Sequence, residues 1–396
     1  MTAYELTPSD EINKRIKRLQ EEMAKKEIDL AFVIQNVDLF YFSGSIQRGY
    51  LFVPSQTEAV FFVEKNYQRA VGETPLKCIQ TPSLKALPSL VSEHGFRGTR
   101  VGFEFDVIPV ALFNRIKTFF KDWEMVDLSP EMKKIRSVKS EFEISQIKRA
   151  GQIVTRVFSE VRHHLREGMT EVELDGILTS LGRAMGHQGL LRMRGLNQEM
   201  MNIHVLSGES ASGTSYCDTP LGGYGTTPAI AQGSSMKKIQ RDQPIVIDYG
   251  VGYNGYVTDE TRTFVIGRLK SHFEKACQVA LHMIAEMESS AGAGELPDQI
   301  YERMQEIAEK EGLASNFMGY GQGKVSFVGH GLGFEINEWP ILSKGKKRPL
   351  QSGMVFAFEP KFVFPNEGAV GIEVDFIVRG QGLERVTESP KDVVYL

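Results

Sequence analysis

Two aspartates, Asp248 and Asp259, are the residues whose type and spacing first suggest chemistry. They lie in PIVIDYGVGYNGYVTDETRTFVIG, residues 244–267, where two apolar runs flank Asn254-Gly255. An Asn-Gly pair between apolar runs is the strongest short-range signal for a β-hairpin. With that turn, the two carboxylates become diagonal neighbours on one face of the hairpin. Because a carboxylate inside a sheet is costly without a positive partner, the pair predicts a common ion or an ion pair.

A second hairpin repeats this arrangement with glutamates. In MVFAFEPKFVFPNEGAVGIEVDFIV the turn signal PNEG is centred near Asn366, which places Glu359 roughly opposite Glu373, and both lie among apolar residues. A histidine, His330, stands in GHGLG between the two hairpins. Isolated buried carboxylates take up protons or are paired. Two acidic pairs with one histidine suit two hard or borderline divalent ions bridged by carboxylates.

Each of these residues also has a structural interpretation. An aspartate in a strand is usually at an edge or paired with an arginine, and Arg262 is available in the first hairpin. A buried histidine is usually a hydrogen-bonded core residue. Taken together the residues favour a metal site, in which the glycines Gly329 and Gly331 beside His330 would let the backbone come close to the metal.

The composition excludes several classes of protein. The chain has 396 residues, 41% hydrophobic and 24% charged, which is typical of a globular protein of two domains. A net charge of -4 predicts no nucleic-acid surface. The polar amino terminus lacks a secretory signal and no segment reaches the length of a membrane span, so we expect a cytoplasmic protein. The three cysteines, without metal or redox spacing, are expected to be buried or half-buried free thiols.

Two domains are predicted from the order of the apolar patterns. Residues 1–130 alternate helical and strand patterns and predict a smaller α/β domain, and LSPEMKKIRSVKS, residues 128–140, is interpreted as a connection because of its proline and mixed charge. Residues 140–396 predict an α+β domain. Within it, two helices followed by strands occur twice, which indicates a weak internal duplication.

The helix starts of the second domain carry capping signals. Ser140 is followed three residues later by Glu143, and Thr170 by Glu173, which is the spacing of a capping box. Helices are also expected over residues 271–289 and 297–312, with strand-like regions over 203–267 and 325–378. The helices that begin at these two caps and the helices over 271–289 and 297–312 are predicted because apolar residues recur at helical spacing.

The chain resembles the pita-bread metallopeptidases, which include methionine aminopeptidase, aminopeptidase P and prolidase, with creatinase as a metal-free relative. DYGVGYNGYVTDETRTF is similar to the family's D-x-G-x-x-x-x-G-Y-x-x-D-x-T-R, and GHGLG, FEP and GIEV follow in the family's order. The amino-terminal segment resembles the smaller domain of aminopeptidase P, prolidase and creatinase, which simple methionine aminopeptidases lack. The resemblance implies a pita-bread catalytic domain and five ligands of a binuclear site: Asp248, Asp259, His330, Glu359 and Glu373.

The same resemblance implies the chemistry. Two divalent ions, manganese first and cobalt or zinc as alternatives, would hold a bridging hydroxide that attacks the scissile carbonyl, with Glu359 as general base. The implied function is a hydrolase of the Xaa-Pro aminopeptidase or prolidase type, acting on a small peptide or amide, and relatives with this two-domain plan are often homodimers.

Three positions depart from the family pattern. A substrate-contacting histidine of the family falls at Ala231 or a near neighbour, and no histidine lies between His204 and His272. A second falls at Asn337, which we place in the substrate pocket, and an arginine of the family falls at Gly371. An asparagine can donate a hydrogen bond but cannot titrate as histidine does.

These departures leave alternatives open. The chain is expected to be a slow Xaa-Pro peptidase, a hydrolase of a different small amide, or a metal-binding protein without catalysis. The long segment SGESASGTSYCDTPLGGYGTTPA could line a rebuilt pocket or form a surface excursion. Its polar neighbours Tyr216, Asp218 and His204 are given no role.

Overall fold

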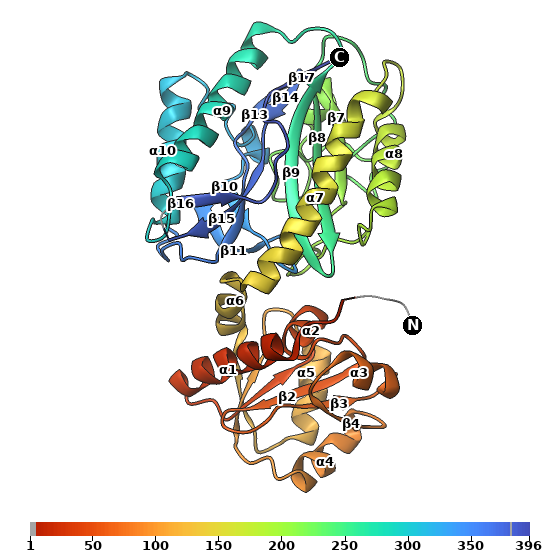
Figure 1. Cartoon of the computed structure of the whole chain (residues 1–396), viewed down its shortest axis with the longest axis vertical. Helices are drawn as coiled ribbons and strands as arrows, with labels where there is room; N and C mark the ends of the chain where they lie inside the picture. The colour runs from red at the N-terminus through yellow and green to blue at the C-terminus, as the bar shows by residue number, and fades with distance from the viewer. Residues whose placement is uncertain (1–4, 381) are drawn as a thin grey trace. The chain divides into compact units, whose positions relative to one another are not determined.

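The computed structural model describes residues 5–380 and 382–396. These residues form two compact units that divide between Arg136 and Ser137, each with its own mixture of helices and strands (Figure 1). The predicted α+β architecture, with a smaller amino-terminal α/β domain, is confirmed.

The first unit is built on a six-stranded sheet in the order β4-β3-β2-β1-β5-β6. The strands are β1 (Leu30–Val33), β2 (Gly49–Pro54), β3 (Val60–Val63), β4 (Lys77–Gln80), β5 (Arg100–Phe103) and β6 (Glu124–Asp127). The helices are α1 (Ser9–Lys25), α2 (Asn36–Ser43), α3 (Tyr67–Glu73), α4 (Leu87–Glu93) and α5 (Val110–Phe119).

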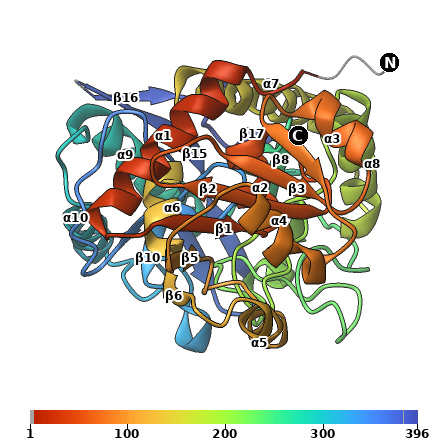
Figure 2. The ribbon, with the colours of Figure 1, turned by 90° about the horizontal axis from the view of Figure 1, so that it is seen from below.

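Alternating side chains of this sheet are buried on both faces. Phe32, Phe52 and Phe62 point to one face, where they pack with residues of α4 and α5 such as Leu87 and Ile116. Helix α1 lies on the opposite side of the strands from α5 (Figure 2). Successive strand residues point to opposite faces, so a sheet covered on both sides requires the continuous apolar runs that the sequence shows.

The segment interpreted as a connection is in fact helical. Helix α6 spans Ser129–Ser137, with Pro130 in its first turn, where a proline costs no intrahelical hydrogen bond. Met132 and Ile135 are fully or almost fully buried. The prediction was wrong because it took the proline as a break, although proline is favoured at the start of a helix.

The second unit places its strands between two pairs of helices (Figure 1). The helices are α7 (Glu141–His164), α8 (Glu171–Ala184), α9 (Ser271–Ser290) and α10 (Pro297–Lys310). Both predicted capping boxes are confirmed, at Ser140 for α7 and at Thr170 for α8. The repeated order of two helices and then strands is also as predicted.

Three sheets form the centre of this unit: a four-stranded sheet β17-β9-β8-β7, a five-stranded sheet β11-β10-β12-β15-β16 and the pair β13-β14. The first set is β7 (Ile203–Ser207), β8 (Ile245–Tyr253), β9 (Tyr256–Val265) and β17 (Val394–Tyr395). The others are β10 (Phe327–Gly331), β11 (Glu338–Ser343), β12 (Val355–Phe358), β13 (Lys361–Phe364), β14 (Gly368–Gly371), β15 (Val374–Arg379) and β16 (Gly382–Arg385).

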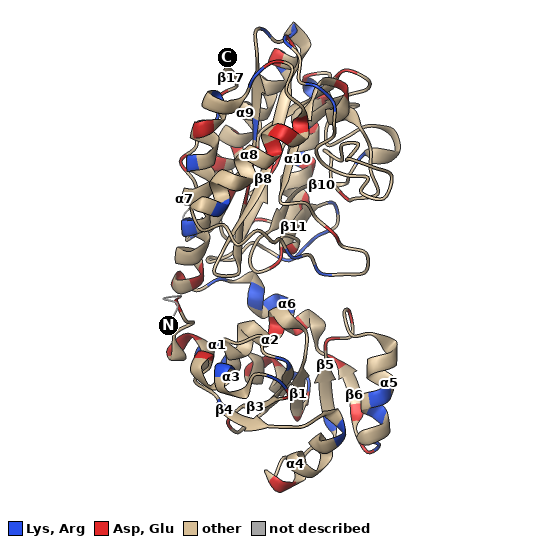
Figure 3. Ribbon diagram, turned by 90° about the vertical axis from the view of Figure 1, so that its right-hand side faces the viewer, with Lys and Arg blue, Asp and Glu red and all other residues tan. Residues whose placement is uncertain are grey.

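The cysteines agree with the sequence prediction. Basic and acidic residues are interspersed along α7 (Figure 3). Cys78 and Cys217 are half-buried and Cys277 is buried, and all three are free thiols, as predicted. Within the described residues, no helix has both the length and the apolar character that a membrane crossing requires.

Candidate metal centre

Both predicted hairpins form, and their register brings the acidic residues together. Asn254 and Gly255 have φ values of 49° and 88°, the left-handed conformation that a two-residue hairpin turn requires. In the resulting ladder Asp248 pairs with Thr261 and Gly250 with Asp259, as the sequence predicted. In the second hairpin Phe358 pairs with Val374 and Lys361 with Gly371, so Glu359 and Glu373 stand opposite each other between these pairs.

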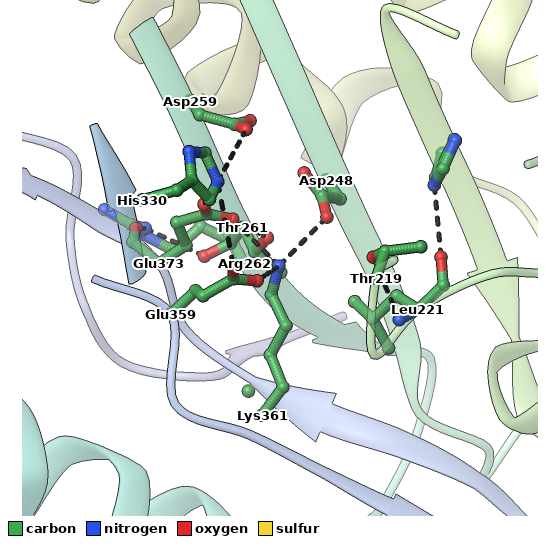
Figure 4. Close-up of polar contacts among 12 residues, drawn as sticks. Thr219, Leu221, Asp248, Asp259, Thr261, Arg262, His330, Glu359, Lys361 and Glu373 are labelled. Atoms are coloured by element: carbon green, nitrogen blue, oxygen red, sulfur yellow. Dashed lines mark hydrogen bonds and ion pairs between the residues drawn. The ribbon is translucent and has the colours of Figure 1, made fainter. Parts of the chain in front are cut away.

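All five predicted ligands converge on one place (Figure 4). His330 comes from β10, and its Nε2 lies 3.6 Å from Glu359 Oε1, 3.8 Å from Glu373 Oε1 and 4.0 Å from Asp259 Oδ2. Asp259, His330 and Glu373 each offer one ligand atom, and these atoms lie within 4.8 Å of one another. The fold therefore gathers one nitrogen and several carboxylate oxygens around a single point.

A lysine that the sequence analysis missed lies among the same carboxylates. The ammonium group of Lys361 is 2.7 Å from Glu359 Oε2, 2.9 Å from Glu373 Oε2 and 3.0 Å from Asp248 Oδ2 (Figure 4). One signal could have found it. Lys361 follows Glu359 by two residues, and residues two apart in a strand point to the same face.

The lysine and its acidic neighbours stabilise each other's charged forms. Burial alone would lower the pKa of Lys361, but Asp248, Glu359 and Glu373 outweigh burial and raise its pKa well above the ordinary value. Burial would likewise raise the pKa of Asp248, yet the Lys361 charge holds it below the usual value. The ion pair therefore stays charged across the neutral range.

The pKa values of the carboxyl groups nearer His330 are shifted upward. Burial, together with the charges of Glu373 and Asp248, raises the pKa of Asp259 well above its ordinary value. Burial also raises the pKa of Glu373 to about 8, with Glu359 and Asp248 adding to the shift and Lys361 opposing it. Without another cation, these two carboxyl groups therefore favour protonation.

The unpartnered atoms test whether a metal ion fits. Among the described residues, Asp259 Oδ1 and Glu373 Oε1 are buried and accept no hydrogen bond. Buried acceptors without partners are rare and costly. Carboxylate oxygens with an imidazole nitrogen form a donor set for divalent ions such as Mn²⁺ or Zn²⁺. Asp259, His330 and Glu373 therefore fit an ion.

Neighbouring residues fix the ligands in place. Thr261 Oγ1 donates to Glu373 Oε2 at 2.7 Å, and Asp375 accepts the backbone N–H of Asp259 at 2.8 Å. Arg262 donates to the Glu373 carbonyl oxygen at 2.7 Å and pairs with Glu260. The arginine therefore supports the backbone of a ligand, and its ion pair is with Glu260.

The glycines beside His330 serve the packing of strands. A Cβ on Gly329 would lie 2.4 Å from the Ala357 carbonyl oxygen of β12, and one on Gly331 would lie 2.2 Å from the Trp339 carbonyl oxygen of β11. That these glycines bring the backbone close to a metal stays a prediction. They let three strands approach closely, and this approach holds His330 in the central strand.

A cavity of about 240 Å³ opens beside the cluster. Its apolar wall includes Leu191, Met200, Phe327, Ile336 and Ile341. Because Asp259, His330, Lys361 and Glu373 also line it, a molecule bound in the cavity would reach the charged groups.

Asn337, which the sequence analysis places in a substrate pocket, lines this cavity, and its amide is already hydrogen-bonded. Its Oδ1 accepts the Arg194 backbone N–H at 3.0 Å, and its Nδ2 donates to the Arg194 carbonyl oxygen at 3.1 Å. This pair of bonds holds the segment that carries Leu191 and Met193 against the cavity. The side chain thus positions a wall of the cavity.

A different histidine occupies the side where the family histidine near Ala231 is absent. His204 pairs with Asp248 across β7 and β8, lines the cavity, and its buried Nε2 has no hydrogen-bond partner among the described residues. Burial lowers its pKa, although the Asp248 charge opposes this. The loop contributes Asp218 and Thr219 to the cavity, while Tyr216 accepts a hydrogen bond from Gln232 at 2.9 Å.

Comparisons with known proteins match both units. The model of the metallopeptidase family M24 matches residues 145–380, and that of the creatinase/prolidase N-terminal domain matches residues 15–138. A similar curated protein is the Xaa-Pro dipeptidase of Pyrococcus furiosus, 25% identical over 97% of this chain and 100% of the relative.

Solved structures share the fold over nearly the whole chain. The Xaa-Pro dipeptidase from Bacillus anthracis has a TM-score of 0.83 at 23% identity. The match covers 97% of this chain and 100% of the dipeptidase chain. The X-Pro aminopeptidase from Thermotoga maritima has a TM-score of 0.79 at 24% identity. The match covers 93% of this chain and 98% of the aminopeptidase chain.

Proposed function

The chain belongs to metallopeptidase family M24, and from this premise we propose that it is a metal-dependent hydrolase of the Xaa-Pro peptidase type. The observation that carries the proposal is the convergence of five residues in the lining of one cavity: Asp248, Asp259, His330, Glu359 and Glu373. The names of similar proteins, which include Xaa-Pro dipeptidases, support the class of bond that is cleaved.

The residues of the site support separate tasks in hydrolysis. A divalent ion held by Asp259, His330 and Glu373 would supply Lewis-acid chemistry and lower the pKa of a bound water. Glu359, whose Oε1 faces this position, is the proposed base that takes a proton from the attacking water. Lys361 keeps Glu359 Oε2 and Asp248 neutralised and so limits the repulsion among the acidic groups.

The cavity wall supports a substrate with an apolar residue beside the cleaved bond. Leu191, Ile336 and Ile341 present aliphatic surface next to the charged cluster. A proline ring can bury its methylene groups there at about 0.8 kcal/mol for each CH₂ removed from water. Asn337 supports the same wall through Arg194 and does not supply the proton chemistry of the family's histidine.

Further properties are proposed together with this function. Manganese suits a donor set made mostly of carboxylate oxygens, with cobalt and zinc as alternatives. We also propose a homodimer in the cytoplasm, on the strength of the family resemblance. Light scattering of the purified chain measures whether it is a homodimer.

The activity is tested with defined peptides. The full chain is treated with a chelator and assayed with added Mn²⁺ against Xaa-Pro dipeptides, longer Xaa-Pro peptides and matched Xaa-Ala peptides. We expect hydrolysis only with metal and preferentially before proline. Asp259→Asn should lose more than the roughly 10- to 100-fold that follows removal of a ligand's hydrogen-bond partner.

The control variant is Asp392→Asn, an exposed change near the carboxyl terminus, which should keep full activity. Bound metal with no turnover of any peptide would favour the metal-binding protein or the hydrolase of another amide over the peptidase. Turnover that survives both chelation and Asp259→Asn would exclude a metal-dependent reaction at this site.

A further inference from the structure

The oxygens of two glutamates in the cluster divide between two positions. Glu359 and Glu373 each turn Oε1 toward His330 Nε2, at 3.6 and 3.8 Å. Each turns Oε2 toward the Lys361 ammonium group, at 2.7 and 2.9 Å (Figure 4). The cluster therefore has two places for positive charge, and a side chain of the protein occupies one of them.

We propose that Lys361 is the permanent second cation of this centre, and that the chain binds one divalent ion where the sequence predicted two. The inference rests on the proposed function, because it takes the cluster as the metal centre of a hydrolase. It assigns the remaining ion to Asp259, His330 and Glu373 and gives the other cation position to the protein itself.

The hydrogen-bonding capacity of the lysine supports this assignment. An ammonium group has three N–H donors, and Lys361 has three carboxylate oxygens at 2.7, 2.9 and 3.0 Å, the distances of charge-assisted hydrogen bonds. A metal ion bound to the same oxygens would need them at about 2.0–2.2 Å. An ion and the ammonium group therefore cannot occupy the same position among these three oxygens.

The lysine is also built into the fold and is not a surface side chain folded inward. Lys361 is 1% exposed and pairs with Gly371 across β13 and β14. A Cβ on Gly371 would lie 2.7 Å from Lys361 Cγ and 2.9 Å from Lys361 Cα. The absence of a side chain at position 371 thus provides the space through which the lysine stem reaches the carboxylates.

The cost of leaving the Lys361 charge unpaired leads to the same stoichiometry. Asp248, Asp259, Glu359 and Glu373 are carboxylates, and Lys361 contributes one positive charge that burial makes costly to leave unpaired. One divalent ion with Lys361 leaves the four acids with a net charge of -1. Two divalent ions would leave a net charge of +1 and would take the hydrogen-bond acceptors from a buried ammonium group.

The experiment counts ions on the full chain. Metal-free protein is titrated with Mn²⁺ by calorimetry, and bound metal is measured by mass spectrometry after gel filtration. We expect one Mn²⁺ per wild-type chain and two per Lys361→Met chain, because methionine keeps the volume of the side chain without the charge. Lys391→Met, which breaks an ion pair with Glu288 elsewhere in the same unit, should still bind one.

Electron paramagnetic resonance gives a readout that does not depend on activity. Wild type saturated with Mn²⁺ should give the spectrum of isolated ions, and Lys361→Met that of an exchange-coupled pair. Two ions in the wild type, or a coupled spectrum, would overturn the inference. A folded Lys361→Met chain that still binds one ion would overturn it as well, and the wild-type count decides the question if the variant does not fold.

The outcomes separate the two proposals. One ion with no peptide hydrolysis would contradict the proposed function and support the inference. Peptide hydrolysis with two ions would support the function and overturn the inference. No bound ion in the wild type or in Lys361→Met would overturn both.

Discussion

At the scale of single residues, Asn337 shows how a polar side chain in the cavity wall can act without touching the reacting groups. Both ends of its amide bond the backbone of Arg194, so the side chain behaves as a clamp on the segment that carries Leu191. This differs from the role expected of a residue that aligns with a catalytic histidine of the family.

The clamp leads to a kinetic prediction. Asn337→Ala removes two hydrogen bonds worth about 0.5–1.5 kcal/mol each, so the cavity wall should loosen and KM for an Xaa-Pro dipeptide should rise about tenfold. The Mn²⁺ stoichiometry should not change, because the amide contacts none of the five proposed ligands. A fall in kcat at constant KM would instead place Asn337 among the groups that act on the substrate.

At the scale of elements, Glu171, the first residue of α8, anchors the loop of residues 207–235, which contributes to the cavity. Glu171 is fully buried and accepts hydrogen bonds from the Ser207 N–H at 2.7 Å, from the Ser235 N–H at 3.0 Å and from the Ser235 hydroxyl at 2.6 Å. It also accepts one from the Ser210 hydroxyl. The two ends of the loop therefore share one carboxylate.

This shared anchor predicts a local effect on dynamics. Glu171→Gln replaces charge-assisted bonds, worth about 1.5–3 kcal/mol each, by weaker neutral ones, so hydrogen exchange should accelerate across residues 207–235. Glu173→Gln is the matched control, because it changes the same helical turn but contacts Thr170 outside the loop. Equal acceleration in both variants would mean that the helix itself, and not the anchor, had loosened.

Elements were predictable where their signals are local. The Asn254-Gly255 turn fixed the register of β8 and β9, and the capping boxes fixed the starts of α7 and α8, because each signal lies within a few residues. Helix α6 was missed because Pro130 was interpreted as a helix break, although proline is favoured in the first turn of a helix. The four carboxylates and His330 could be identified because acidic residues in apolar strands demand a partner.

The spacing of two residues relates Lys361 to Glu359, but the other partners of the lysine could not be placed with the same reasoning. In EPKFVF the lysine reads as an ordinary strand residue, and its environment is set by Asp248 of β8 and by the bare backbone of Gly371. Neither is near it in the sequence. Side chains that complete a site across strands are fixed by tertiary packing, which hairpin and helix patterns do not describe.

At the scale of the whole molecule, all proposed ligands lie in the unit that begins at Ser137, and each of the two units has its own apolar core. A ligand that binds only the folded state stabilises the unit that contains its site. The amino-terminal unit contributes none of these ligands, so it should be indifferent to metal.

Metal removal should therefore act on one unit. At a Mn²⁺ concentration of about 100 times Kd, we expect about 2.7 kcal/mol of added stability in residues 137–396. Hydrogen exchange with and without metal should show the protection there and none in residues 5–136. The same measurement on Asp259→Asn should show no metal effect, and equal protection of both units would contradict the assignment of the site to one of them.

The position of Lys361 also bears on how the protein tolerates scarcity of metal. A dissolved ion leaves a site when its concentration falls below Kd, whereas a group attached to the backbone keeps the same effective concentration at any dilution. One third of the positive charge in this cluster, the charge of Lys361 against the two of a divalent ion, is thus part of the chain itself and cannot be withdrawn by a chelator or by a competing protein. The lysine side chain is ordered when the chain folds. The charge of the acidic residues is therefore partly neutralised even when no ion is bound.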